Sequence, residues 1–175
     1  MSELFDGTWR IDGAQSKVWD ENAQAYVEDE VGDEVITMKI LNDIQDYEVL
    51  YGDDPQITLG YSSRYDDSQW VPYLVRAIRH LGEGPVEDSI SAFKNRIHAQ
   101  EGTEARRQFE IGKAYAFVRT IYVDPRTHYR VARHPDGETA QAMMLRRMSE
   151  DGLSYVATVL DPNGVISRIR KFVRV

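Results

Sequence analysis

Single arginines interrupt otherwise apolar stretches of this sequence, and of all the residues they are the clearest candidates for binding a ligand. Arg76 lies in the segment QWVPYLVRAIR (69–79), and Arg119 lies in AYAFVRTIYVD (114–124). An interior arginine needs an anionic partner, because burial of an unpaired guanidinium is costly. That partner is either an internal carboxylate or the carboxylate or phenolate of a bound molecule. The alternative for each arginine is a surface position reached by its extended stem. We expect one or two of the following set to reach a cavity: Arg64, Arg76, Arg119, Arg146 and Arg170.

Tyrosines are the second group with this potential. The chain has ten of them, and each offers an apolar ring with a phenol tip that suits the wall of a binding site. Ordinary packing within a sheet is the alternative role for each ring. From both groups we predict one ligand-binding set: Tyr61, Tyr73, Arg76, Arg119, Tyr122 and Arg170.

The four histidines, His80, His98, His128 and His134, do not have the spacing of a metal site. His128 and His134 are six residues apart, which is about 20 Å along an extended strand. We therefore expect neither a metal nor a cofactor. His98 and His128 are candidates for a general base under an enzymatic alternative, because imidazole titrates near neutral pH. A surface position near a strand end is the plainer interpretation of each.

The segments that carry these residues have the composition of β-strands. They are rich in β-branched and aromatic residues, and turn residues such as Asp-Gly and Asn-Gly separate them. The predicted strands are 34–41, 46–52, 56–65, 69–79, 114–124, 127–134, 140–149, 153–161 and 165–175. Short links between neighbours imply antiparallel pairing in an up-and-down order.

Residues 81–113 interrupt the strands. After Pro85, the residues Val86, Ile90, Phe93 and Ile97 have near-helical spacing, which predicts one helix of about four turns. The helical insertion is thus expected around 85–110, with a second short helix or a cover after it. The acidic stretch 14–33 predicts a short strand at 17–19 and a long loop.

The strand count favours a closed barrel, because closure removes exposed sheet edges. We predict a mainly all-β fold in a single domain spanning residues 1–175. The expected architecture is an antiparallel up-and-down β-barrel of about 8–10 strands with one helical insertion. If it binds a ligand, its interior should hold a cavity of roughly a few hundred Å³.

Composition excludes several classes of protein. The chain has no cysteine, so disulfides and thiolate chemistry are absent. No apolar run approaches the length of a membrane span, and the first residues lack the pattern of a secretion signal. The net charge of −8 disfavours nucleic-acid binding. We expect a cytoplasmic protein with no nucleic-acid or membrane partner. The oligomeric state stays open, with a homodimer among the possibilities.

Both ends of the chain carry a resemblance to a known superfamily. Gly7-Thr8-Trp9, together with the basic segment RIRKFVRV (168–175), resembles the calycins, which include lipocalins and intracellular fatty-acid-binding proteins. The resemblance implies that the Trp9 indole packs against a basic residue of the last strand, which assigns structural roles to Gly7, Trp9 and Arg174. It also implies that Arg170 holds a ligand carboxylate, as in the Arg-x-Tyr ending of many such proteins, although Phe172 replaces the tyrosine. The helix pair expected after the first strand is missing.

Three functions are compatible with these observations. The first is binding of an apolar, anionic small molecule inside the barrel. The second is cofactor-independent lyase or isomerase chemistry on a small aromatic or terpenoid acid, which calycin barrels are known to carry. The third is an interaction module whose acidic first third, with 15 acidic and 3 basic residues in 1–60, meets a basic partner.

Overall fold

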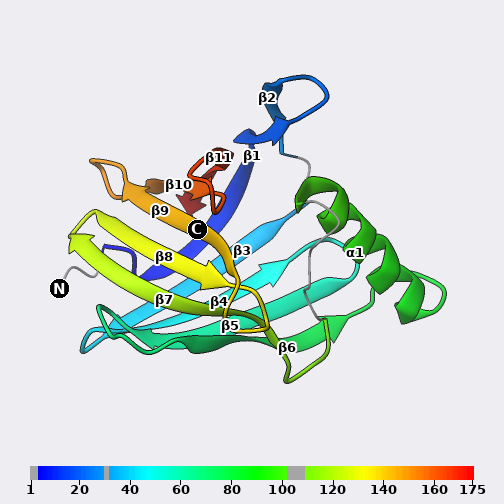
Figure 1. The fold of residues 1–175 in the computed structure, drawn as a ribbon, viewed down its shortest axis with the longest axis horizontal. Helices are drawn as coiled ribbons and strands as arrows, with labels where there is room; N and C mark the ends of the chain where they lie inside the picture. The colour runs from blue at the N-terminus through cyan, green and yellow to red at the C-terminus, as the bar shows by residue number, and fades with distance from the viewer. Residues whose placement is uncertain (1–3, 30–31, 102–108) are drawn as a thin grey trace.

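The computed structural model describes residues 4–29, 32–101 and 109–175, with the backbone alone for 94 and 96–101 (Figure 1). More than half of these residues lie in β-strands, and all the strands except β2 follow one another in space in the order of the sequence. The elements are β1 (Gly7–Asp20), β2 (Ala25–Glu28), β3 (Glu34–Leu41), β4 (Ile44–Tyr51), β5 (Gln56–Arg64), β6 (Val71–Arg79), α1 (Val86–Glu101), β7 (Ala114–Asp124), β8 (Thr127–Arg133), β9 (Ala140–Met148), β10 (Ser154–Leu160) and β11 (Ile166–Arg174).

Ten of these strands form a closed antiparallel barrel. Each strand from β3 to β11 pairs with the next, and β1 closes the ring by pairing with both β3 and β11. In the closing seam, Trp9 lies opposite Arg174 and Ile11 lies opposite Phe172. β2 lies outside the ring because it pairs only with the far end of β1. The predicted antiparallel barrel is confirmed, with one strand beyond it.

Alternating side chains fill the barrel interior. In β3, Ile36, Met38 and Ile40 are buried, and in β4 every second side chain from Gln45 to Tyr51 is buried. This alternation follows from the pleat of a strand, which sends successive side chains to opposite faces. The predicted strands agree with the observed ones to within about two residues. The segment 17–19, predicted as a separate strand, is instead the far end of β1.

The helical insertion is α1, and it lies at one end of the barrel (Figure 1). Its Phe93 is buried and packs edge-on against Tyr51 at the end of β4, with ring centroids 5.4 Å apart. Phe93 also meets Phe109, which in turn packs against Tyr115 of β7. Aromatic contacts therefore hold α1 over this end of the barrel. Residues 102–108, where a second short helix or cover is predicted, lie outside the described residues.

Among the described residues, no helix is both long and apolar enough to cross a membrane.

Candidate ligand-binding cavity

A cavity of about 110 Å³ lies inside the barrel, near the end that α1 covers. It is smaller than the volume expected from the sequence, and its scale is that of a single aromatic ring. Tyrosines and aliphatic residues form most of its wall. Four charged side chains also reach it: Glu34, Arg130, Arg168 and Arg170.

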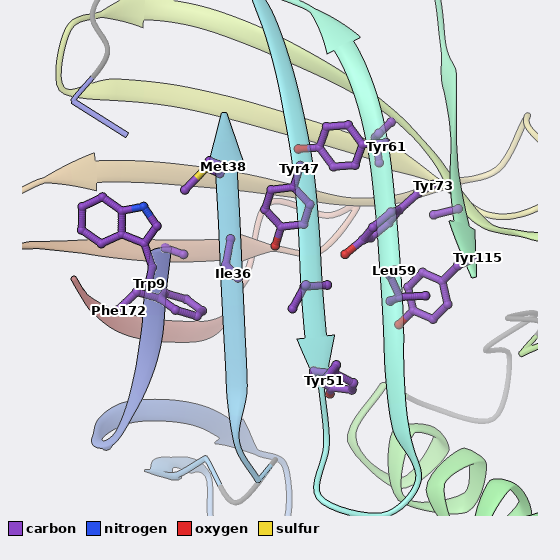
Figure 2. Packing of buried hydrophobic residues seen from close by; sticks show 14 of the residues in the cluster. Trp9, Ile36, Met38, Tyr47, Tyr51, Leu59, Tyr61, Tyr73, Tyr115 and Phe172 are labelled. Carbon is purple, nitrogen blue, oxygen red and sulfur yellow. The ribbon is translucent and has the colours of Figure 1, made fainter. Parts of the chain in front are cut away.

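The aromatic wall comes from inward positions on β4, β6 and β7. Tyr47 and Tyr51 both project inward from β4, and Tyr73 and Tyr115 project from β6 and β7 (Figure 2). Tyr47 and Tyr73 meet edge-on at 5.9 Å between ring centroids. Burial raises the pKa of both Tyr47 and Tyr73 above the ordinary value. These phenols are therefore neutral at physiological pH and supply no negative charge to the arginines.

Arg170 lines the cavity, but two buried carboxylates already neutralise it. Its Nε donates to Asp29 Oδ2 and its Nη1 donates to Glu34 Oε2, each at 3.0 Å. Burial raises the pKa of Glu34, and the attraction of Arg170 opposes that shift. The role implied for Arg170 by the family resemblance, as the holder of a ligand carboxylate, is thus filled from within the chain. Phe172 has a packing position, stacked on Tyr155 at 5.0 Å.

Arg130 is the cavity arginine that lacks such compensation. Its Nη1 is buried and has no hydrogen-bond partner among the described residues, and no carboxylate of that part of the chain lies within ion-pair distance of it. Its guanidinium lies over the rings of Tyr47 and Tyr73, at 5.3 and 5.4 Å from their centroids. Cation–π contacts offset only part of the cost of burying a charge. An anion bound in the cavity would offset the remaining cost of burying this charge.

Arg146, unlike the half-buried Arg130, is a fully buried residue; it lies deeper in the barrel and does not line the cavity. Its Nη1 donates to Gln45 Oε1 at 3.4 Å, whereas Nε and Nη2 have no partner among the described residues. Gln45 also accepts from Tyr61 at 2.8 Å and donates to Tyr65 at 2.6 Å. Arg146 lies 5.1 Å from the Tyr47 ring centroid, so this one ring contacts both buried guanidiniums. Among the described residues, neither Arg130 nor Arg146 has a carboxylate within ion-pair distance.

His128 extends the hydrogen-bonded series of Arg146, Gln45 and Tyr65 away from the cavity. Its Nδ1 lies 2.8 Å from the Tyr65 hydroxyl, and its ring packs against Phe5 at 4.3 Å. Burial, followed by repulsion from Arg146, lowers the pKa of His128 to about 3. A base with so low a pKa is a poor proton acceptor near neutral pH. The side chain of His98, the other base candidate, lies outside the described residues.

Several predicted lining residues do not reach the cavity. Arg76 points outward, where it pairs with Glu48 at 2.9 Å and lies across Gly60. Arg119 also lies on the outer face, with Nε donating to the Asp67 carbonyl. Both predictions are wrong for the same reason: the stem of a strand arginine can cover apolar surface while its charge stays in water.

The tyrosine predictions have mixed outcomes. Tyr73 lines the cavity. Tyr61 is buried beside it, stacked on Tyr47 at 4.9 Å, but does not form the wall. Tyr122 is half-buried and packs against Tyr65 and His128, away from the cavity.

Arg130 was absent from the predicted set because its strand gives a misleading pattern. In THYRVAR, Tyr129 and Val131 are the more apolar face, so alternation alone turns Arg130 outward. Pairing with both neighbours reverses this, since Arg130 lies opposite inward-facing Thr120 of β7 and Met144 of β9. The inward orientation of Thr120 and Met144 on the neighbouring strands is the sequence signal that would have placed Arg130 inside the barrel.

The opposite end of the barrel is closed by the residues that carry the family resemblance. Trp9 is fully buried, and its Nε1 donates to the Phe5 carbonyl at 3.0 Å. The Arg174 guanidinium lies 4.2 Å from the Trp9 ring centroid. Gly7 has a φ of +131°, and a Cβ there would come within 2.5 Å of Arg174 Nη1. A glycine at position 7 therefore allows the arginine to cover the indole.

Groups of three or more His, Cys, Asp or Glu side chains suited to a metal ion are absent from the described residues.

Comparison with known proteins identifies the fold. No family model and no curated protein matches the sequence. Two solved structures of the fluorescent protein UnaG, one of the wild type and one of a mutant, each match with a TM-score of 0.57 and 14% identity. Each alignment covers 100% of this chain, with 100% of the wild-type chain and 99% of the mutant chain. Zebrafish ileal bile acid-binding protein complexed with cholic acid matches with a TM-score of 0.47 and 10% identity, over 98% of this chain and 99% of its own. With the ten-strand closure, the mid-chain helix and the Gly7–Trp9–Arg174 end, the chain has a closed antiparallel barrel of the calycin fold.

Proposed function

We propose that this protein binds a small monoanionic molecule inside the barrel, with the carboxylate or phenolate of the ligand on Arg130. One observation carries the proposal. The Nη1 of Arg130 is buried at the wall of the cavity and has no hydrogen-bond partner among the described residues. A buried polar atom without a partner is uncommon in native proteins, and a bound group is one explanation for it. A bound anion would satisfy the hydrogen bond and balance the charge at once.

The cavity restricts the size of the ligand. A volume of about 110 Å³ suits a body of one aromatic ring or a short aliphatic chain. Tyr47, Tyr51, Tyr73 and Tyr115 offer flat apolar faces to such a body. We therefore propose a monocyclic aromatic or short-chain acid as the ligand class.

Thermal unfolding with a matched set of ligands tests this proposal. Benzoate and phenylacetate carry the anion, and benzamide has a similar shape without the charge. At a concentration of 100 times Kd, a ligand that binds only the folded state stabilises it by about 2.7 kcal/mol. For a chain of this length, that shifts Tm upward by about 5–10 °C. We expect this shift with an acid and a much smaller one with benzamide.

Arg130→Met separates binding from stability. The change removes an uncompensated buried charge, so we expect the ligand-free protein to be as stable as the wild type or more stable. Affinity for the acid should fall at least about tenfold, because a hydrogen bond to a charged group contributes roughly 1.5–3 kcal/mol. Arg76→Met is the matched control, since Arg76 lies on the outer face of the barrel. Equal binding of benzoate and benzamide, or unchanged acid affinity in Arg130→Met, would contradict the proposal.

A further inference from the structure

His80 joins three separate segments at the covered end of the barrel. It lies in the link between β6 and α1. Its Nδ1 is 2.9 Å from Asp54 Oδ1, in the turn between β4 and β5, and 3.2 Å from the Ser89 hydroxyl in the first turns of α1. Its Nε2 is 3.0 Å from the Gly84 carbonyl in the link itself. The imidazole therefore ties the start of the covering helix to the barrel.

The partners of the two ring nitrogens determine the charge of this imidazole. A carbonyl oxygen only accepts, so the contact with Gly84 requires a proton on Nε2. Asp54 is held as an ionised acceptor, because the Leu81 and Gly82 amides donate to its carboxylate at 3.1 Å each. The contact with Asp54 thus requires a proton on Nδ1 as well. A neutral imidazole has one ring proton and would set a lone pair against one of these oxygens.

We propose that His80 is a pH-dependent latch: as an imidazolium it holds the first turns of α1 against the β4–β5 turn, and its deprotonation weakens this connection. Release of this part of α1 would loosen the Phe93 contact with Tyr51 and so expose the covered end of the cavity. The latch is a property of the helix and its link, and it does not depend on which ligand the barrel binds.

The surrounding charges agree with this assignment. The charged group in contact with His80 is Asp54 of the β4–β5 turn, while α1 contributes a neutral hydroxyl and the link a carbonyl. Glu83 in the link and Glu87 and Asp88 in the first turn of α1 add negative charge to these segments, and Arg79 ends β6. The hydrogen bond to Asp54 raises the pKa of His80 above its ordinary value of 6.5. Because the latched state has the higher pKa, the latch holds at low pH and weakens as pH rises through that pKa.

The first experiment reads the protonation state directly. Nitrogen NMR of histidine-labelled wild-type protein at pH 6 should show both ring nitrogens of His80 protonated. His80 should titrate above pH 6.5. A neutral ring at pH 6, with one bare nitrogen, would overturn the proposal without any substitution.

The second experiment measures the release of α1. Amide hydrogen exchange of residues 87–93, corrected for the intrinsic rate, should show protection that falls by up to tenfold per pH unit from about pH 6.5 to the pKa of His80. His80→Gln should have low protection in this segment at every pH, while amides of the barrel strands keep theirs. Asp53→Asn is the matched control, because it removes another carboxylate of the same turn. The Asp53 carboxylate contacts the Asp33 amide and not His80. Protection of α1 that is high and pH-independent in His80→Gln would refute the latch.

Discussion

Two arginines at the same cavity differ in what surrounds them. Arg170 has Asp29 and Glu34 as partners, so its charge is balanced inside the protein. Arg130 lies over the rings of Tyr47 and Tyr73 and forms no ion pair with a carboxylate among the described residues. Removal of one partner from a buried ion pair leaves a costly charge, whereas replacement of an unpaired charge by an apolar group does not. In our proposal, the first arrangement contributes to the fold and the second takes the ligand.

His128 should make the stability of the protein depend on pH. Its folded pKa of about 3 lies below the ordinary value of 6.5, so the unfolded chain binds a proton that the folded chain excludes. This contribution is fully present above pH 6.5 and is lost as pH falls from 6.5 to about 3. The slope is at most about 1.4 kcal/mol per pH unit for one proton.

Urea unfolding of the wild type and His128→Asn at pH 7, 5 and 4 measures this effect. In the wild type, the Tyr65 hydroxyl contacts His128, and an Asn side chain at this position can still accept a hydrogen bond from that hydroxyl. The variant should lose less free energy of unfolding on acidification, because carboxylates contribute equally to both proteins. Parallel losses in the two proteins would show that His128 is not the cause.

At the scale of elements, the two ends of the barrel are closed by different means. Trp9 and Arg174 close one end through strand residues within the β1–β11 seam. The other end is covered by α1, which enters between β6 and β7. Strand residues are held by ladder hydrogen bonds, whereas the described contacts of α1 with the barrel are side-chain contacts, such as those of Ile90, Phe93 and the His80 cluster. Opening is therefore expected at the α1 end.

Arg174→Met should lower the free energy of unfolding by about 1–2 kcal/mol. The substitution removes the cation–π contact with Trp9 and the hydrogen bonds to the Leu4 and Asp6 carbonyls. Arg64→Met is the control: Arg64 is also a strand arginine with a carbonyl partner, Asn42, but it lies over no buried ring of the described residues, so we expect a change within about 0.5 kcal/mol. Chemical denaturation of both variants measures the free energy of unfolding. Equal decreases in the two variants would contradict a specific stabilising role of Arg174 over Trp9.

At the scale of the whole molecule, the uneven charge of the sequence has a structural use. The acidic first third and the basic last third meet where β1 and β11 close the ring, and Arg170 binds Asp29 and Glu34 across this boundary. Part of the acidity that suggested a basic protein partner is thus consumed within the fold.

Deletion of residues 166–175 should open the barrel. Without β11, both β1 and β10 would present unpaired edges, which promote association of chains. We expect a truncated protein that elutes as aggregates in size-exclusion chromatography and lacks a cooperative urea transition. A monomeric truncated chain with wild-type cooperativity would show that closure is dispensable.

The sequence alone determined strands β3 to β11, their antiparallel order and the position of the helical insertion, whereas β2 lies in a stretch predicted as a long loop. These depend on local composition, on a pleat of period two and on turn residues, all of which can be read along the chain. The resemblance to the calycins implied the contact of Trp9 with a basic residue of the last strand, and in the structure Gly7, Trp9 and Arg174 lie together.

Only the tertiary structure decided which charges face inward and which are already paired. Arg76 and Arg119 have the same apolar sequence surroundings as an interior arginine but lie outside. Arg130 lies on the more polar face of its strand yet points inward, because pairing with β7 and β9 sets its orientation. Asp29 and Glu34, more than 130 residues from Arg170, neutralise it through the closing seam. The pairing of distant charges depends on register and closure, which no local pattern contains.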